Sequence, residues 1–101
     1  MLIRGDFDAN RRRDYAALVA AGSKTYLVIF LARRTGYKMY FSEEPFTDYL
    51  MLAERGTRAF NYDQQRHIAY SNDAIVTVIF EKGGSSHVFQ KGRFRTFTSI
   101  D

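Results

Sequence analysis

The chain has 101 residues, a net charge of +4 and no cysteine. This length predicts a single domain over residues 1–101 with one hydrophobic core. The lack of cysteine excludes a disulfide framework, thiolate chemistry and a zinc finger. No apolar run is long enough to cross a bilayer or to act as a signal peptide. We therefore expect a cytoplasmic protein, of the cell itself or of a host that carries a foreign gene, with no membrane partner.

The N-terminal segment predicts a strand followed by a helix. Met1–Phe7 is expected to form a short strand, and Asp6 and Asp8 offer carboxylates that accept free backbone N–H groups at a helix start. The helix is expected over Ala9–Ala21, with Gly22 in the glycine position that follows many helices. Its apolar residues recur at i, i+3 and i+4: Tyr15, Leu18 and Val19.

The most apolar run, Thr25–Ala32, is rich in β-branched and aromatic residues and predicts a buried central strand. The turn Arg33–Gly36 joins it to a second strand, Tyr37–Phe41. A hairpin closed by this turn sets three apolar pairs opposite each other: Val28 with Phe41, Phe30 with Met39 and Ala32 with Tyr37. We expect that set to face the core. The other face is expected to be only partly covered and carries Ile29, Leu31, Lys38 and Tyr40.

A second helix is predicted after this hairpin. Ser42 is a suitable N-cap, and the two glutamates and Pro45 that follow it suit the first turn. The buried stripe is expected at i, i+3, i+4 and i+7: Phe46, Tyr49, Leu50 and Ala53. Met51 and Leu52 fall off that stripe, so the helix is either covered on a wider face or offers apolar surface to a partner, and Gly56 ends it.

The second half of the chain predicts a meander of strands. The expected strands are Thr57–Tyr62, Arg66–Ser71, Ala74–Glu81, His87–Gln90 and Arg93–Thr98. Lys82–Ser86 is expected to be a loose, glycine-rich hairpin loop. The predicted fold is α+β: one mostly antiparallel sheet of about five to seven strands with two helices packed on one face. The element order β-α-β-β-α-β-β-β-β-β begins like a ferredoxin-like unit, which specifies no function.

The last hairpin is the most informative surface. With a Lys91–Gly92 loop, the strand pairs are Gln90 with Arg93, Phe89 with Phe94, Val88 with Arg95 and His87 with Thr96. One face then carries Gln90, Arg93, Arg95 and Phe97, with Lys91 at the tip. Such a face can grip phosphates and stack a base, or it can anchor an acidic protein. A solvated sheet face is the alternative. Further candidates for partner contact are Arg33, Arg34, Lys38 and Tyr40.

A catalytic hypothesis rests on Glu81, His87 and Arg95, which supply a base, an acid and a phosphate stabiliser for metal-free RNA cleavage if strand pairing brings them together. The expected register counts against it, because His87 and Arg95 then lie on opposite faces. Neither histidine has further ligands at metal-binding spacing, so we expect no metal site and no cofactor.

Arginine dominates the basic residues, since only four of the fifteen Lys and Arg residues are lysines. Arginine and tyrosine are enriched at protein interfaces. The alternative explanation is the base composition of the host genome, which can favour arginine over lysine without any function. We expect first a non-enzymatic protein-binding regulator or inhibitor that occludes a partner's surface. A nucleic-acid-binding module ranks second and a small ribonuclease third. Small motif-free chains of this kind are typical of phage and plasmid accessory proteins, including inhibitors of host defence such as anti-CRISPR proteins.

Overall fold

The computed structural model describes residues 1–100, which form ten strands and no helix. The strands are β1 Leu2–Gly5, β2 Asp14–Ala21, β3 Lys24–Arg33, β4 Gly36–Glu43, β5 Tyr49–Ala53, β6 Arg58–Asn61, β7 Arg66–Ala69, β8 Ala74–Ile79, β9 Gly83–Gln90 and β10 Arg93–Ile100. Every pairing between them is antiparallel. The predicted α+β fold is therefore wrong, and the fold is all-β. No helix among the described residues has the length and apolar character that a membrane span requires.

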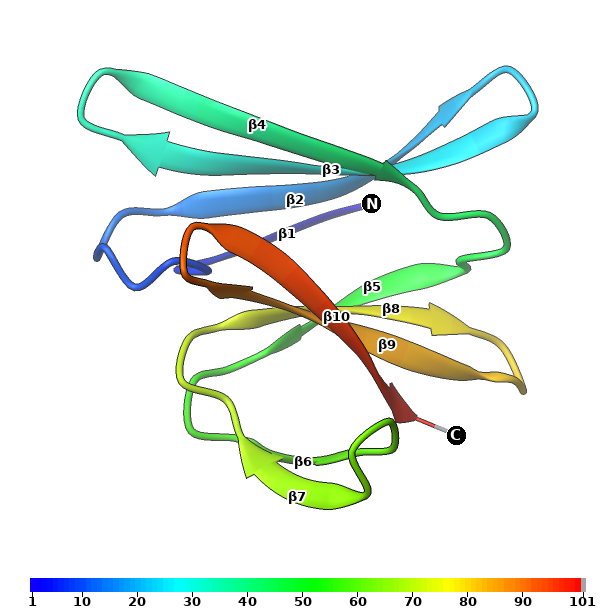
Figure 1. Cartoon of the computed structure of the whole chain (residues 1–101). Coiled ribbons are helices and arrows are strands. Elements are labelled where there is room, and N and C mark those ends of the chain that lie inside the picture. Colours follow the sequence, from blue (N-terminus) through cyan, green and yellow to red (C-terminus); the bar gives the residue numbers. More distant parts are fainter. Residues whose placement is uncertain (101) are drawn as a thin grey trace.

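The strands form three layers (Figure 1). Sheet A has the order β1-β2-β3-β4, sheet B has the order β10-β9-β8-β5, and β6 and β7 form a separate hairpin. Sheet B is the middle layer, with sheet A on one face and the hairpin on the other. Strand β8 lies inside sheet B, so five of its six residues are buried whichever face they point to.

The helix predicted for residues 9–21 is wrong, because this segment forms a loop and then β2. Asp14, Ala16 and Leu18 alternate toward the core, as a strand requires, and the residues between them point outward. Gly22 has a φ of 64°. It occupies the first position of the two-residue turn between β2 and β3, where the type I′ and type II′ turns of β-hairpins favour glycine.

The second predicted helix is also wrong. Strand β4 continues to Glu43, and after a turn the chain forms β5. Phe46, the first residue of the expected helical stripe, is 83% exposed. Leu50 and Leu52 instead point inward at strand spacing and pack in the core between the sheets. Met51, between them, points to the other face and is 45% exposed.

The predicted register of β3 against β4 is confirmed, but the predicted core face is wrong. Val28 pairs with Phe41, as expected. The buried face carries the alternate residues of β3: Leu27, Ile29 and Leu31. Tyr37, Met39 and Phe41 lie on the outer face, where they are 58%, 56% and 67% exposed. Because both faces of this hairpin are apolar, alternation alone does not say which face sheet B covers.

The strands of the second half occur as predicted, within one or two residues at their ends, except around the glycine-rich segment. Strand β9 begins at Gly83, so the turn is Phe80–Lys82 and the expected loop over Lys82–Ser86 is wrong. Gly84 is required where β9 passes β8, because a Cβ there would lie 2.7 Å from the backbone oxygen of Thr77.

Two apolar clusters hold the layers together. The cluster between sheets A and B contains the buried residues Phe7, Ala16, Leu27, Ile29, Leu31, Leu50 and Ile75. The cluster between sheet B and the β6–β7 hairpin contains Tyr70, Ala74 and Phe97, with Ile68 and Val88 beside them. The largest fully buried apolar side chains, Phe7, Leu27, Leu31 and Ile75, all belong to the first cluster, and their burial stabilises the fold.

Candidate functional site

The outer face of sheet A is an apolar surface that no other described segment covers (Figure 1). The strand registers place twelve apolar side chains on it: Leu2, Tyr15, Ala17, Val19, Ala21, Tyr26, Val28, Phe30, Ala32, Tyr37, Met39 and Phe41. Four strands about 4.8 Å apart and up to eight or ten residues long give this face an area on the order of 400 Å². Patches of about 300–600 Å² are the largest on most monomers and are often functional.

Aromatic contacts organise this outer face. The Tyr37 ring lies 6.4 Å from both the Tyr15 and the Phe30 rings. The Tyr26 ring meets the Phe41 ring edge-on at 6.4 Å. These cross-strand pairs hold the rings in place before any partner binds, which reduces the side-chain entropy that binding would cost.

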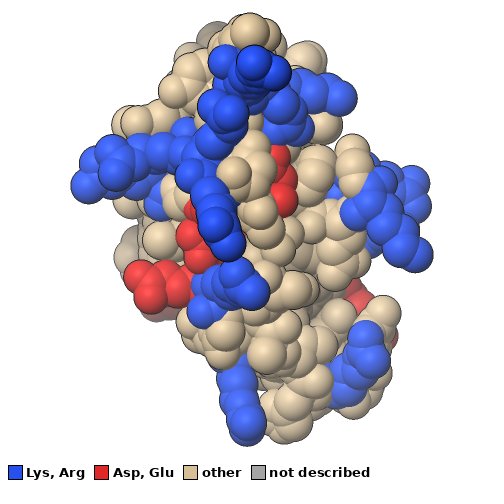
Figure 2. Space-filling view, turned by 90° about the vertical axis from the view of Figure 1, so that its left-hand side faces the viewer, with Lys and Arg blue, Asp and Glu red and all other residues tan. Residues whose placement is uncertain are grey.

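Charge is sparse on the outer face and dense at one end of the molecule. Within the described residues, the registers place only Arg4, Lys24 and Glu43 among its charged side chains, and the last two pair with each other at 3.8 Å. Figure 2 shows Lys and Arg gathered over the end that carries the β1–β2 loop and the β3–β4 and β9–β10 turns. The exposed arginines of the first two segments are Arg11, Arg12, Arg13 and Arg34.

The C-terminal hairpin has the predicted register but not the predicted open face. Gln90, Arg93 and Arg95 are exposed, together with Lys91 in the turn. Phe97, in contrast, is only 9% exposed and stacks on the Tyr70 ring at 6.3 Å. It lies beneath the β6–β7 hairpin and is not free to stack a base.

The other predicted partner contacts separate in space. Arg34 and Lys38 are exposed, and the Lys38 ammonium lies 5.3 Å above the Tyr40 ring. Tyr40 packs inward, with its ring 5.4 Å from that of Phe94, so it belongs to the core between the sheets. Arg33 is held in an ion pair with Asp8 at 2.6 Å.

A groove of about 350 Å³ lies between the β6–β7 hairpin and the last two strands. Arg66 and Arg95 reach it from opposite sides, and Tyr70 and Phe97 line it. The groove is therefore polar at its mouth and aromatic within. Its two guanidinium groups are the feature of this region that best suits an anion.

The residues of the ribonuclease hypothesis are not brought together. His87 is 5% exposed and lies in the interior, where its Nε2 and Nδ1 atoms contact the Thr77 and Thr96 hydroxyls at 3.0 Å each. Burial lowers the pKa of His87 below its usual value of 6.5, and the nearby Glu44 carboxylate opposes this effect. Glu81 lies in the β8–β9 turn, whereas His87 pairs with a residue at the opposite end of β8.

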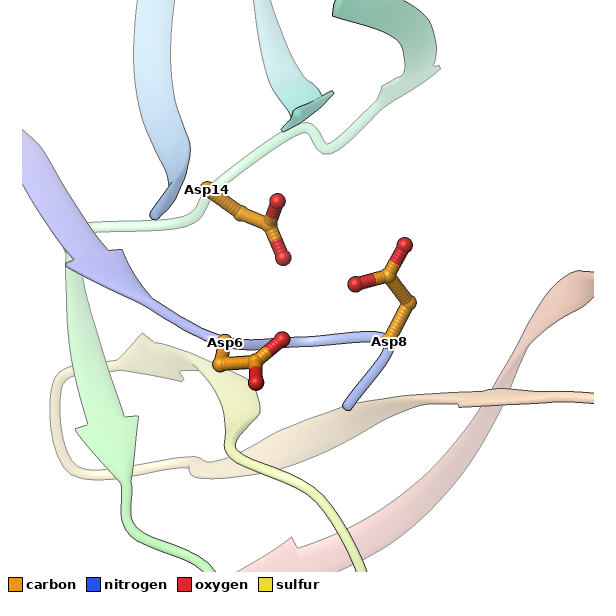
Figure 3. A group of neighbouring side chains, drawn as sticks. All are labelled: Asp6, Asp8 and Asp14. Carbon is orange, nitrogen blue, oxygen red and sulfur yellow. The ribbon is translucent and has the colours of Figure 1, made fainter. Parts of the chain in front are cut away.

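Three aspartates that the sequence analysis did not treat as a site converge where the β1–β2 loop meets sheet A. Each of Asp6, Asp8 and Asp14 contributes an oxygen to a group whose members lie within 4.8 Å of one another (Figure 3). The helix-start role expected of Asp6 and Asp8 is wrong, because no helix follows. Asp14 is fully buried. Regular spacing of oxygen-bearing side chains at residues 6, 8, 10 and 14 is the signal that would have revealed this cluster.

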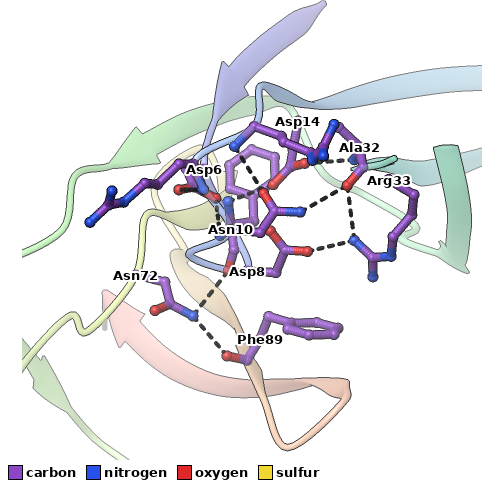
Figure 4. A network of polar contacts seen from close by, with 11 residues as sticks. Asp6, Asp8, Asn10, Asp14, Ala32, Arg33, Asn72 and Phe89 are labelled. Atoms are coloured by element: carbon purple, nitrogen blue, oxygen red, sulfur yellow. Dashed lines mark hydrogen bonds and ion pairs between the residues drawn. The ribbon is translucent and has the colours of Figure 1, made fainter. Parts of the chain in front are cut away.

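Backbone N–H groups position these carboxylates (Figure 4). Asp14 accepts hydrogen bonds from the N–H groups of Phe7 at 2.8 Å and Ala32 at 2.7 Å. Burial raises the pKa of Asp14 from 3.8 to about 6, the two N–H groups act in the opposite direction, and the Asp8 and Asp6 carboxylates add to the rise. The cluster thus links the loop to sheet A.

Asparagine side chains complete this network. Asn10 donates to the backbone oxygen of Ala32 at 2.9 Å and so fixes the loop on β3. Asn72 donates to the backbone oxygens of Phe7 at 3.1 Å and Phe89 at 3.0 Å. The loop is therefore tied to both sheets.

No protein-family model, curated protein or solved structure matches this chain. Among the surfaces of the chain, the outer face of sheet A combines the most exposed apolar side chains, whereas the arginine face of the C-terminal hairpin lacks the aromatic residue that was expected to complete it.

Proposed function

We propose that this protein is a non-enzymatic binding module whose outer face of sheet A holds an acidic protein partner. The observation that carries the proposal is the exposure of Tyr37, Met39 and Phe41, each more than half accessible, on one strand of an otherwise well-packed sheet. Large contiguous patches of exposed apolar side chains are often protein interaction surfaces.

The side chains on this face match the composition of interface centres. Aromatic residues and methionine are enriched at such centres, and charged residues are depleted there. Tyr37 and Phe41 offer broad rings that neighbouring rings already hold in place. Burying such a side chain contributes about 1.5–3 kcal/mol.

Charge favours an acidic partner over a second copy of this chain. Arg4 lies on the outer face, and the arginines of the β1–β2 loop and the β3–β4 turn lie at one end of the same sheet. Two copies, each with a net charge of +4, would bring like charges together in a dimer. A partner with an apolar patch bordered by carboxylates complements both features.

The test uses a photo-crosslinkable phenylalanine analogue at position 41, with the same analogue at position 80 as a matched control. Phe80 is as exposed as Phe41, at 70% against 67%, but lies in the β8–β9 turn. A protein captured in the source cells from position 41 alone is then purified. Its affinity for the unmodified chain is compared with its affinity for Met39→Lys/Phe41→Lys and for Phe80→Lys.

We expect the double variant to bind at least about 100-fold more weakly, since each lost apolar contact costs roughly tenfold or more, and we expect Phe80→Lys to bind normally. The affinity should also fall as salt rises, because the arginines contribute to it. An equal loss in both variants would contradict the proposal.

Two further experimental outcomes would assign a different binding partner to this protein. Sedimentation of the purified chain as a dimer that Phe41→Lys dissociates would assign the outer face to a second copy. Tight binding of RNA or DNA that weakens steeply between roughly 50 and 200 mM salt, and is lost in Arg93→Ala/Arg95→Ala, would assign the function to the hairpin face instead. Either result overturns the proposal of an acidic protein partner.

A further inference from the structure

The aspartate cluster of the β1–β2 loop has the geometry of a cation site. Calcium binds oxygen ligands at about 2.3–2.6 Å, so two of its ligands lie at most about 5 Å apart. The oxygens of Asp6, Asp8 and Asp14 that face one another are all within 4.8 Å. A calcium ion placed between them lies within about 2.8 Å of all three oxygens, so small side-chain rotations are enough to bring it to bonding distance.

A buried carboxylate oxygen in this cluster favours a bound cation. The Asp8 side chain is only 6% exposed, and its Oδ2 atom is paired with Arg33. Its Oδ1 atom is buried and has no hydrogen-bond partner among residues 1–100. Figure 3 shows an oxygen of Asp8 directed toward the carboxylates of Asp6 and Asp14. Burying an unsatisfied carboxylate oxygen is costly, and a bound cation removes that cost.

Part of the loop has the residue spacing of the EF-hand calcium loop. Asp6, Asp8, Asn10 and Asp14 stand at the first, third, fifth and ninth positions of the EF-hand calcium loop. The sixth position of that loop is a glycine that makes a sharp turn. Here it is Arg11, whose φ of 64° is the left-handed conformation that glycine favours.

Hydrogen bonds hold the first ligand of the loop in place. The Asp6 carboxylate accepts the N–H groups of Asn10 at 3.1 Å and Arg11 at 2.8 Å. Each of its oxygens keeps a second lone pair for a metal ion. The conformation is thus formed before any ion binds, although strands rather than helices follow it.

We propose that Asp6, Asp8 and Asp14 bind a calcium ion in the β1–β2 loop. Oxygen ligands on a loop of irregular geometry suit calcium better than magnesium, which requires a near-octahedral set at shorter distances. Ala17 occupies the twelfth position, where EF-hand loops have a bidentate glutamate. The site therefore has fewer ligands, and we expect a Kd on the order of 0.1–1 mM, as in weak calcium modules.

The test is a titration of the purified chain with calcium chloride, followed by calorimetry and by the melting temperature, with magnesium chloride in parallel. Calcium at about ten times its Kd should raise the melting temperature by roughly 6–11 °C, and magnesium should raise it much less. Asp8→Asn should lose the calcium effect. Asp63→Asn, the same change at an exposed aspartate outside the cluster, should keep it.

The calcium titration of the unmodified chain is sufficient by itself to overturn the proposal. Neither binding heat nor a thermal shift with calcium up to about 10 mM would overturn the proposal, because that concentration exceeds the expected Kd at least tenfold. Equal calcium responses in Asp8→Asn and Asp63→Asn would also overturn it. If Asp8→Asn does not fold, as circular dichroism would reveal, Asp6→Asn takes its place. The titration needs no protein partner, so its result is independent of the function proposed for sheet A.

Discussion

The assignment of the two faces of sheet A makes a sharp prediction about stability. Leu31 is fully buried between the sheets, and Phe41, on the neighbouring strand, is 67% exposed. Leu31→Ala removes buried apolar atoms and leaves a cavity, so it should lower the free energy of unfolding by about 2–5 kcal/mol. A domain of this size is stable by only about 5–15 kcal/mol, so much of its stability would be lost.

Phe41→Ala serves as the matched comparison. It removes more atoms than Leu31→Ala does, yet the cross-strand contacts that it breaks, with Val28 and Tyr26, lie on the outer face, so it should cost at most about 1 kcal/mol. Urea unfolding followed by circular dichroism measures both changes, with the m value as a check that the unfolded states are comparable. A larger loss for Phe41→Ala than for Leu31→Ala would refute the assignment of the faces.

Three further predictions concern sheet B. As the pH falls below about 6.5, His87 takes up a proton in the unfolded chain but not in the folded one, so folding stability that is present above that pH is lost. Urea titrations should therefore show that the unmodified protein loses stability at low pH relative to His87→Gln. A stability difference between the two proteins that does not depend on pH would contradict this prediction. Gly84→Ala should cost about 1–3 kcal/mol in the same assay, because its Cβ would meet the Thr77 backbone oxygen at 2.7 Å, and unchanged stability would be evidence against that close approach. Tyr70→Phe removes a buried 2.6 Å hydrogen bond to Ser86 and should lower the melting temperature by an amount equivalent to about 1 kcal/mol; no shift would mean that the bond contributes little.

The two helix predictions were wrong because a short apolar pattern can fit both the 3.6-residue period of a helix and the two-residue period of a strand. Tyr15, Leu18 and Val19 have helical spacing, but Leu18 points into the core and Val19 away from it. The same eight-residue segment also alternates, starting from Asp14. Alanine favours helices in isolation, and tertiary pairing with β3 overrides that preference. A segment that can take either form is decided by its neighbours in space.

Local pairing was predictable where a turn fixed it, but its consequences in three dimensions were not. Both hairpin registers followed from turn length, including Phe30 opposite Met39 and Phe89 opposite Phe94. Which face of the β3–β4 hairpin is buried depends on sheet B, which packs on it from the distant second half of the chain. The burial of Phe97 has the same origin, because the β6–β7 hairpin folds over it.

The aspartate cluster was recognisable in the sequence but hidden by the expectation of a helix. Two of its members were expected to be capping residues, a role that explains carboxylates near a helix start. In the structure the same carboxylates hold a loop, and Asp14 joins them from the start of β2. The burial of the Asp14 carboxyl group, which raises its pKa, depends on contacts that only the folded chain provides.

The most direct test of the outer face of sheet A as a binding surface is cross-saturation NMR on the complex with the purified partner. With the partner irradiated and the chain labelled at methionine and valine methyl groups, we expect signal loss at Val19, Val28 and Met39, which lie on that face. Val88, beside the β6–β7 hairpin, should be unaffected. Loss at Val88 without loss at Met39 would contradict the proposal and place the partner on sheet B.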